Sequence, residues 1–282
     1  MCIRDRDYTA RGKIITPLKD RIGSEIRTHY PQSRAAAMDI TEQEAWQARE
    51  QAIPLQVPPY VREVVEEIAF QARGNSKIDK RSGVSQRLPI SVLENVISNA
   101  ERRAIAHGET LVVPRVADVY AAIPAITGKF ELEYEGELKG ADAVARDLIR
   151  SAVMNVATGY FRDADARGAV RWFDGGGSLQ LSDTTGARDL VDRTREIDGL
   201  HEAALQANGD AKPGQAELAS AIDFALEALC AQKKISRSDD WKYSAGEGAG
   251  SRRQPQGRER ARHEAFDDDE QLNMPGKKKY YN

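Results

Sequence analysis

The chain has 282 residues, of which 40% are hydrophobic, and this composition is typical of a soluble globular protein with one large or two modest domains. Its 41 basic and 44 acidic residues leave a net charge of −3, without the basic excess of a typical nucleic-acid binder, so we expect no nucleic-acid partner. No apolar run approaches the roughly 18 residues of a membrane-spanning helix and no secretory signal is recognisable, so we expect no membrane association and a cytoplasmic location.

The first forty residues hold two predicted elements after an irregular start. Residues 1–6 show neither helical nor strand periodicity, and we interpret them as a non-native scar at the cut end of a longer reading frame. Pro17 opens a short predicted helix that runs to Ile22. The stretch 25–30 then alternates polar and apolar residues, which predicts a strand.

Residues 41–127 are predicted to be all-helical. A capping-box pattern at 41–44 predicts one helix start, and a second helix follows Pro58-Pro59, where apolar residues recur at helical spacing. A second capping box begins at Ser91, and the helix that it opens is expected to end at His107-Gly108. A further short helix is predicted from Pro114 to Ile123.

The rest of the chain is predicted to be a mostly helical extension followed by a tail. The alternation over 129–135 predicts a strand, the apolar positions over 144–156 a long helix, and those over 218–229 another helix, with a Gly-rich break at 174–178. After Lys233 charged residues dominate and large apolar residues are rare, so we expect disorder.

One dense motif runs from Asp7 to Gly23 and contains Pro17-Leu18-Lys19-Asp20-Arg21-Ile22-Gly23. It resembles the second half of an AAA+ ATPase core of the magnesium-chelatase I-subunit and MoxR-like group. The resemblance implies that Arg21 is an arginine finger, which acts in trans on the nucleotide of a neighbouring subunit. A guanidinium suits that role because phosphoryl transfer spreads negative charge over the phosphate oxygens. Without its flanks, an Asp-Arg pair on a short helix is more often a solvated surface pair.

A second motif, Gly83-Val84-Ser85-Gln86-Arg87, precedes a predicted helix. It is similar to the Ser-x-Arg of the same family, and the resemblance implies that Arg87 is the sensor-2 arginine, which binds the nucleotide of its own subunit. A lid arginine bound to the terminal phosphate would couple nucleotide state to lid closure. Taken alone, Arg87 is more often a surface charge at a helix entry. The resemblance covers residues 7–125 well, continues loosely to 161, and ends there.

The resemblance fails at the phosphate loop. No Gly-Lys pair of the chain fits the pattern G-x-x-x-x-G-K-[ST], and no apolar strand ends in the paired acids of a Walker B segment. We interpret the chain as a C-terminal fragment of such an ATPase, the alternative being a degenerate, non-catalytic relative. We therefore expect the chain alone neither to bind ATP measurably nor to hydrolyse it.

Other candidate residues favour structural roles. His29 and His107 are interpreted as packing or capping residues, and the glutamates over 131–137 as the solvated side of a strand rather than a metal site. Two cysteines at opposite ends of the chain and four scattered histidines predict neither a disulfide framework nor a metal site. The basic clusters at 252–253 and 277–279 are interpreted as parts of a solvated tail.

The expected fold class is mainly α with a little β. The expected organisation is a scar (1–6), the C-terminal piece of an AAA+ α/β core (7–40), a helical lid domain (41–127), a small, mostly helical α+β extension (128–232) and a disordered charged tail (233–282).

By resemblance, the complete parent uses ATP and Mg²⁺ and assembles into a ring, expected to be a hexamer. It works with a von Willebrand A-type partner and remodels a protein or assists metal insertion. The competing hypothesis is a non-enzymatic helical protein-interaction module, which the missing phosphate loop and the charged tail both favour.

Overall fold

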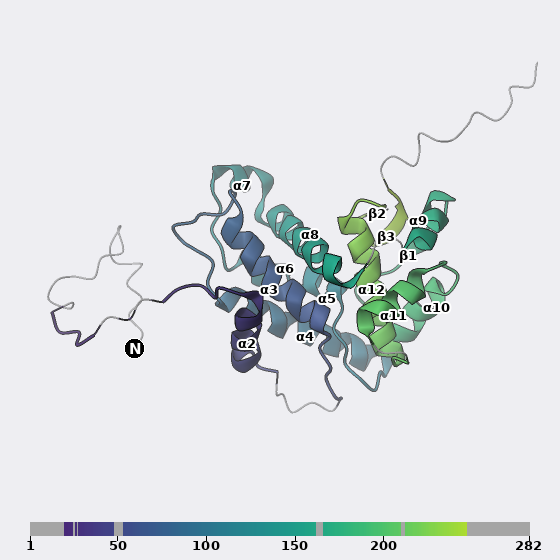
Figure 1. The fold of residues 1–282 in the computed structure, drawn as a ribbon, viewed down its shortest axis with the longest axis horizontal. Helices are drawn as coiled ribbons and strands as arrows, with labels where there is room; N and C mark the ends of the chain where they lie inside the picture. The colour runs from purple at the N-terminus through teal and green to yellow at the C-terminus, as the bar shows by residue number, and fades with distance from the viewer. Residues whose placement is uncertain are drawn as a thin grey trace, which may run out of the picture. The chain divides into compact units, whose positions relative to one another are not determined.

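The computed structural model describes residues 20–24, 26, 28–47, 53–161, 166–209 and 212–246, and these residues are mainly helical with one small sheet (Figure 1). The helices are α2 (Arg34–Glu44), α3 (Pro59–Gly74), α4 (Arg87–His107), α5 (Val116–Ala121), α6 (Ile123–Thr127), α7 (Tyr134–Lys139), α8 (Ala141–Tyr160), α9 (Arg167–Asp174), α10 (Ala187–Thr194), α11 (Leu200–Asn208) and α12 (Gln215–Ala231). The strands are β1 (Leu179–Gln180), β2 (Ile235–Arg237) and β3 (Lys242–Ala245). The expectation of a mainly α chain with a little β is confirmed.

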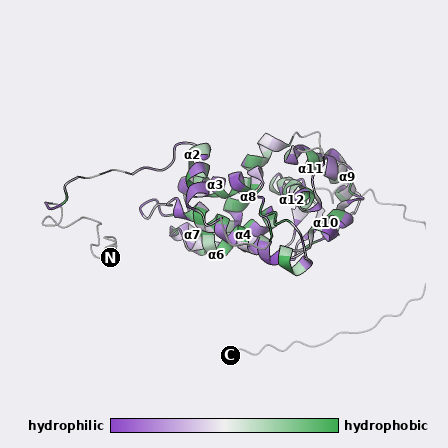
Figure 2. Cartoon of the chain, turned by 90° about the horizontal axis from the view of Figure 1, so that it is seen from below, coloured by the Kyte–Doolittle hydropathy of each residue, from purple (hydrophilic) through white to green (hydrophobic). Residues whose placement is uncertain are grey.

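The long helices form where apolar residues recur at helical spacing. Pro59 occupies the first turn of α3, where its missing N–H costs nothing, and the apolar residues that follow are buried. Helix α4 ends at Gly108, whose φ of 63° is left-handed, as predicted. Its start differs from the prediction, since α4 begins at Arg87 and not after Ser91. Figure 2 shows hydrophobic and hydrophilic residues mixed along these helices, as is expected of helices around a shared core.

An aromatic cluster joins three long helices. Tyr60 of α3 stacks on Phe224 of α12 with ring centroids 4.6 Å apart, and Tyr160 of α8 meets both rings edge-on. Helices α3 and α8 pack against each other, and α8 also packs against α12. One continuous hydrophobic cluster therefore includes residues from 45 to 243. The predicted boundary between 127 and 128 does not separate two cores.

The sheet has two of its three strands, β2 and β3, where the sequence predicted disorder. Its order is β1-β3-β2 with both pairs antiparallel, so Tyr243 of β3 faces Leu179 on one side and Arg237 on the other. Tyr243 is fully buried, and the Arg237 guanidinium carbon lies 4.2 Å from the ring centroid of Trp241. The prediction of disorder after Lys233 is therefore wrong for residues 233–246, because aromatic side chains anchor them.

Three other predictions are wrong. Thr41 does not start a helix: α2 begins at Arg34, with Ser33 as its N-cap. The predicted strand over 129–135 is reduced to one antiparallel bridge between Leu132 and Ile78, because no longer strand lies beside it. Helix α7 follows at once. The predicted strand over 25–30 is also not formed at the described positions 26 and 28–30.

Some predictions lie outside the described residues. These are the scar at 1–6, most of the Asp7 to Gly23 motif, and the tail beyond 246. Two compact units divide the chain at 247 and 248, and everything described below belongs to the first.

Candidate functional site

Arg87, one of the two predicted site residues, lies on the rim of a cleft of about 900 Å³. It is the first residue of α4 and its side chain is exposed. Three segments distant in sequence line the cleft, namely residues 28–31, 82–87 and 128–131. This volume falls within the range of about 300–1,000 Å³ that is usual for small-molecule sites. The cleft is therefore the candidate site.

Gln86 fixes the backbone immediately before Arg87. Its side-chain amide nitrogen lies 2.9 Å from Oε2 of Glu66 and 3.2 Å from both Oγ1 of Thr41 and the carbonyl oxygen of Ala37. Its amide oxygen accepts a hydrogen bond from Nη2 of Arg73 at 3.1 Å. Gln86 thus joins α2 and α3 to the start of α4, while the neighbouring Arg87 is left facing solvent.

Glu66 is the buried carboxylate at the centre of this network. Its exposed fraction is 1%, and burial raises the pKa of its carboxyl above the ordinary value. Hydrogen bonds from Thr41 and Gln86 oppose that shift. Because a buried carboxylate needs these donors, Gln86 contributes to the stability of the fold as well as to the position of Arg87.

Tyr30 links the N-terminal segment to the same loop. Its ring lies under the guanidinium of Arg73, 4.4 Å from the centroid, and its hydroxyl accepts a hydrogen bond from the N–H of Val84 at 3.1 Å. Gly83 has a φ of 68°, and a Cβ at that position would lie 2.5 Å from the Tyr30 hydroxyl. Glycine is therefore required at position 83 for two reasons.

The third wall of the cleft is tied to the loop before α4 by backbone hydrogen bonds. The N–H of Asp79 donates to the carbonyl of Glu131 at 2.9 Å, and the N–H of Glu133 donates to the carbonyl of Lys77, also at 2.9 Å. The hydroxyl of Ser82 donates to the Glu131 carboxylate. These hydrogen bonds fix the position of segment 128–133 relative to segment 77–82, and Lys129 belongs to the first of these segments.

The cleft is electropositive at its rim. Among the described residues, neither Arg87 nor Lys129 has a carboxylate partner, and Glu131 is the one acid in the lining. The first turn of α4 contains no acidic residue. Unpaired cations beside a helix N-terminus favour an anionic ligand.

These residues suit phosphate oxygens better than they suit a metal. A guanidinium and an ammonium are both common phosphate ligands. No group of three His, Cys, Asp or Glu residues within the described part of the chain is placed to hold a metal ion. The lining of the cleft therefore favours an anionic ligand over a metal ion.

Arg21 lies apart from this cleft lining. It is exposed in a turn at residues 20 and 21, and the preceding residues 17–19 of its motif lie outside the described part. The structure therefore does not bring Arg21 into the cleft that Arg87 borders.

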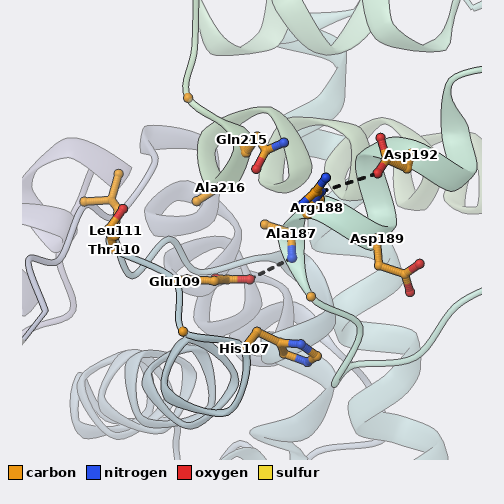
Figure 3. Close-up of a pocket in the computed structure, with 13 residues that line it drawn as sticks. His107, Glu109, Thr110, Leu111, Ala187, Arg188, Asp189, Asp192, Gln215 and Ala216 are labelled. Atoms are coloured by element: carbon orange, nitrogen blue, oxygen red, sulfur yellow. Dashed lines mark hydrogen bonds and ion pairs between the residues drawn. The ribbon is translucent and has the colours of Figure 1, made fainter.

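A second cavity, of about 790 Å³, differs in having its charges compensated (Figure 3). Oε1 of Glu109 accepts the backbone N–H of Ala187 at 2.7 Å, and Arg188 lies beside Asp192 in Figure 3, with Nε and Oδ2 3.9 Å apart. Asp189 pairs with Arg193 at 2.8 Å. These contacts hold α10 in place and leave little charge for a ligand.

The two histidines have different surroundings. His107 ends α4 and is exposed, and its Nε2 lies 2.8 Å from the carbonyl oxygen of Thr184, a contact that ties the end of α4 to the segment before α10. His29 is exposed and lines the cleft, so it is not a packing residue, and its Nδ1 lies 2.9 Å from the carbonyl oxygen of Tyr30. The predicted strand does not form at residues 28–30.

Another cluster of charges is buried in the core. Asp118 accepts hydrogen bonds from Arg103, from Asn99 at 2.6 Å and from the N–H of Arg115 at 2.7 Å. Arg115 is 1% exposed and donates to the carbonyl of Thr185 at 2.7 Å. Because these groups bind one another and are sealed from solvent, their role is structural.

Asp223 of α12 belongs to the same buried region. Its Oδ2 accepts the N–H of Ala117 at 3.0 Å. Burial raises the pKa of Asp223 to about 7, the charge of Glu227 acts in the same direction, and the Ala117 hydrogen bond and Arg115 oppose them.

Sequence reasoning did not single out Gln86, Glu66 or Lys129. Gln86 lies within the Ser-x-Arg motif, but nothing in its identity indicates an inward orientation. Glu66 lies on the apolar face of α3, and a charged residue at such a position is the one feature of the sequence that indicates a buried polar contact there.

The comparisons with known proteins identify no relative: no family model, no curated protein and no solved structure matches the chain. In the described residues, no helix has the length and apolar character needed to cross a membrane.

Proposed function

We propose that the chain is the lid-bearing part of an ATP-hydrolysing AAA+ ring motor resembling the magnesium-chelatase and MoxR-like group. The observation that carries the proposal is Arg87, which has no carboxylate partner among the described residues and borders a cleft large enough for a phosphate ligand. Gln86 holds the backbone before it, so the cation is presented from a fixed position.

In this proposal the two arginines act on different nucleotides. Arg87 contacts the nucleotide of its own subunit, while Arg21 is offered to the nucleotide of the adjacent subunit in a ring, expected to be a hexamer. Bound ATP with Mg²⁺ supplies the phosphoryl group. The contribution of each guanidinium is to offset the negative charge that develops on the phosphate oxygens.

If the parent is such a motor, it also acts on a partner protein. By the same resemblance, the partner is a von Willebrand A-type protein, and the work is protein remodelling or assistance in metal insertion. We prefer remodelling, because no residue of this chain selects metal insertion into a porphyrin.

The competing function is a non-enzymatic helical interaction module. The absence of a phosphate loop from this sequence favours it. Determination of the DNA sequence upstream decides between the two: a Walker A and a Walker B segment within about one domain, roughly 200 residues, support the motor. A genuine start codon at Met1 supports the module.

Calorimetry on the chain itself tests the part of the proposal that concerns its completeness. We expect no heat of binding when Mg·ATP is titrated into the chain at micromolar concentrations, because the main phosphate donors are missing. A micromolar dissociation constant would instead reveal a complete phosphate site within this sequence.

A further inference from the structure

We infer that Lys129 is a second phosphate-binding cation of the Arg87 cleft, so that the ligand is an anion with more than one phosphate group. The identification of the anion as a nucleotide rests on the proposed function, whereas the shared position of the two cations is read from the structure alone. Lys129 lies beyond the part of the sequence that resembles the ATPase family well, so the resemblance does not assign it a role.

The two cations reach the same cleft from opposite parts of the chain. Arg87 begins α4, whereas Lys129 follows α6, where its N–H donates to the carbonyl of Ile126 at 3.1 Å. Both residues line the cleft. Hydrogen bonds that involve Asp79, Ser82 and Glu131 connect the two walls of the cleft. The backbone positions of the two cations are therefore fixed relative to each other.

The charge balance of the cleft favours a multiply charged anion. Two cations face it without carboxylate partners among the described residues, and the one acid of the lining, Glu131, is bonded to Ser82. Two like charges in one cleft repel each other, and an anion placed between them removes that repulsion. A single phosphate offers less charge for two cations than a diphosphate or triphosphate does.

Other lysines of the same region are different. Lys139 pairs with Asp147, so its charge is compensated. Lys80 is exposed in the loop between α3 and α4 and does not line the cleft. Lys80 therefore provides a matched control, being a nearby lysine with the same charge outside the site.

The experiment is a titration of the isotope-labelled 282-residue chain, followed by amide chemical shifts at low ionic strength. The probe is inorganic pyrophosphate, with sodium sulfate and sodium chloride at equal ionic strength as controls. We expect amides in segments 82–88 and 128–131 to shift together with one dissociation constant. The binding is expected to be millimolar, too weak for the calorimetric titration above, because the phosphate loop is missing.

Variants then separate the contributions. Lys129→Ala and Arg87→Ala are each expected to weaken pyrophosphate binding about three- to fivefold, the usual scale for exposed charge pairs. Lys129→Arg is expected to retain most of the binding, and Lys80→Ala to leave it unchanged. Circular dichroism spectra of all variants are expected to match that of the parent chain, since both side chains are exposed.

The outcomes distinguish this inference from the proposed function. If Arg87→Ala weakens binding and Lys129→Ala does not, the role of Lys129 is overturned and that of Arg87 stands. If neither segment responds, or if chloride has the same effect as pyrophosphate, both are overturned. Equal losses for Lys80→Ala and Lys129→Ala show general charge attraction and overturn the site.

Discussion

Gln86 donates its side-chain amide to the buried carboxylate of Glu66 at 2.9 Å. The contact ties the start of α4 to α3 one residue before Arg87, and it makes the Ser-x-Arg motif part of the core as well as part of the cleft. The inward glutamine and the outward arginine therefore have separable roles.

Replacing Gln86 by Leu is expected to destabilise the chain by about 1–3 kcal/mol, because Glu66 loses a donor and Arg73 an acceptor in a buried setting. Chemical denaturation measures the change. The matched control is Gln43→Leu on the exposed side of α2, where a change within about 0.5 kcal/mol is expected. Equal effects of the two substitutions would show that the Gln86 network does not hold the loop.

The contribution of Asp223 to the free energy of unfolding is expected to fall as the pH rises from about 4 to about 7. The pKa of Asp223 is raised from 3.8 to about 7, so between these values the folded chain keeps a proton that the unfolded chain releases. One such proton gives a limiting slope of about 1.4 kcal/mol per pH unit.

The variant Asp223→Asn isolates that component, since its amide oxygen still accepts the N–H of Ala117 and does not titrate. The difference in unfolding free energy between the parent chain and this variant is expected to change across pH 4 to 7 in favour of the variant. Asp39→Asn, on the exposed side of α2, serves as the control for the substitution itself. The same pH dependence for both variants, or a flat difference for Asp223→Asn, would refute the titration of this buried carboxyl.

Two truncations test the corrected boundary of the fold. Ending the chain after residue 239 removes Trp241 and all of β3 with the buried Tyr243, and is expected to lower the melting temperature by many degrees. Ending it after residue 247 removes none of the described core and is expected to have little effect. Thermal unfolding followed by circular dichroism makes the comparison. Similar melting temperatures for the two truncations would argue against a structural role for β3.

The two arginines are expected to differ in a full-length parent that contains a phosphate loop. Arg21→Ala should lower turnover by roughly a thousandfold while leaving ATP affinity nearly intact, because a finger acts on the transition state of the neighbour. Arg87→Ala should weaken nucleotide binding as well as turnover. Steady-state ATPase assays and nucleotide titrations measure both.

Subunit mixing provides the control for that experiment. Subunits with Arg21→Ala, mixed with subunits whose phosphate loop is broken, should regain partial activity at mixed interfaces. The same mixing should not rescue Arg87→Ala, because that residue and the phosphate loop must act within one chain. Identical behaviour of the two variants would contradict the assignment of finger and sensor.

The helical core could be predicted well from the sequence, and the reasons are local. Helices α3, α8 and α12 have apolar residues at regular spacing, and Gly108 ends α4 where a left-handed residue is needed. The sheet could not be predicted in this way, because β2 and β3 are short and their stability depends on distant groups. The Tyr243 hydroxyl donates a hydrogen bond to Glu227, and the Arg237 guanidinium stacks on the Tyr120 ring. No local sequence pattern predicts either contact.

The candidate site was predictable only in part. Arg87 was found from its motif, whereas Lys129 reaches the cleft because segments 77–82 and 128–133 are bonded together. That pairing is a tertiary event between residues about fifty positions apart, and the alternating residues over 129–135 suggested a regular strand instead.

The anchoring of Tyr30 sets a geometric limit on Arg21. Nine positions separate the two residues, and an extended chain spans at most about 3.4 Å per residue, so the Cα atom of Arg21 lies within roughly 30 Å of that of Tyr30. While the Tyr30 ring stays against Arg73, the positions that Arg21 can reach are therefore limited to those near the loop that leads into α4. If a substitution released Tyr30, the nearest fixed residue would be at the start of α2, and Arg21 could then reach positions farther from this loop.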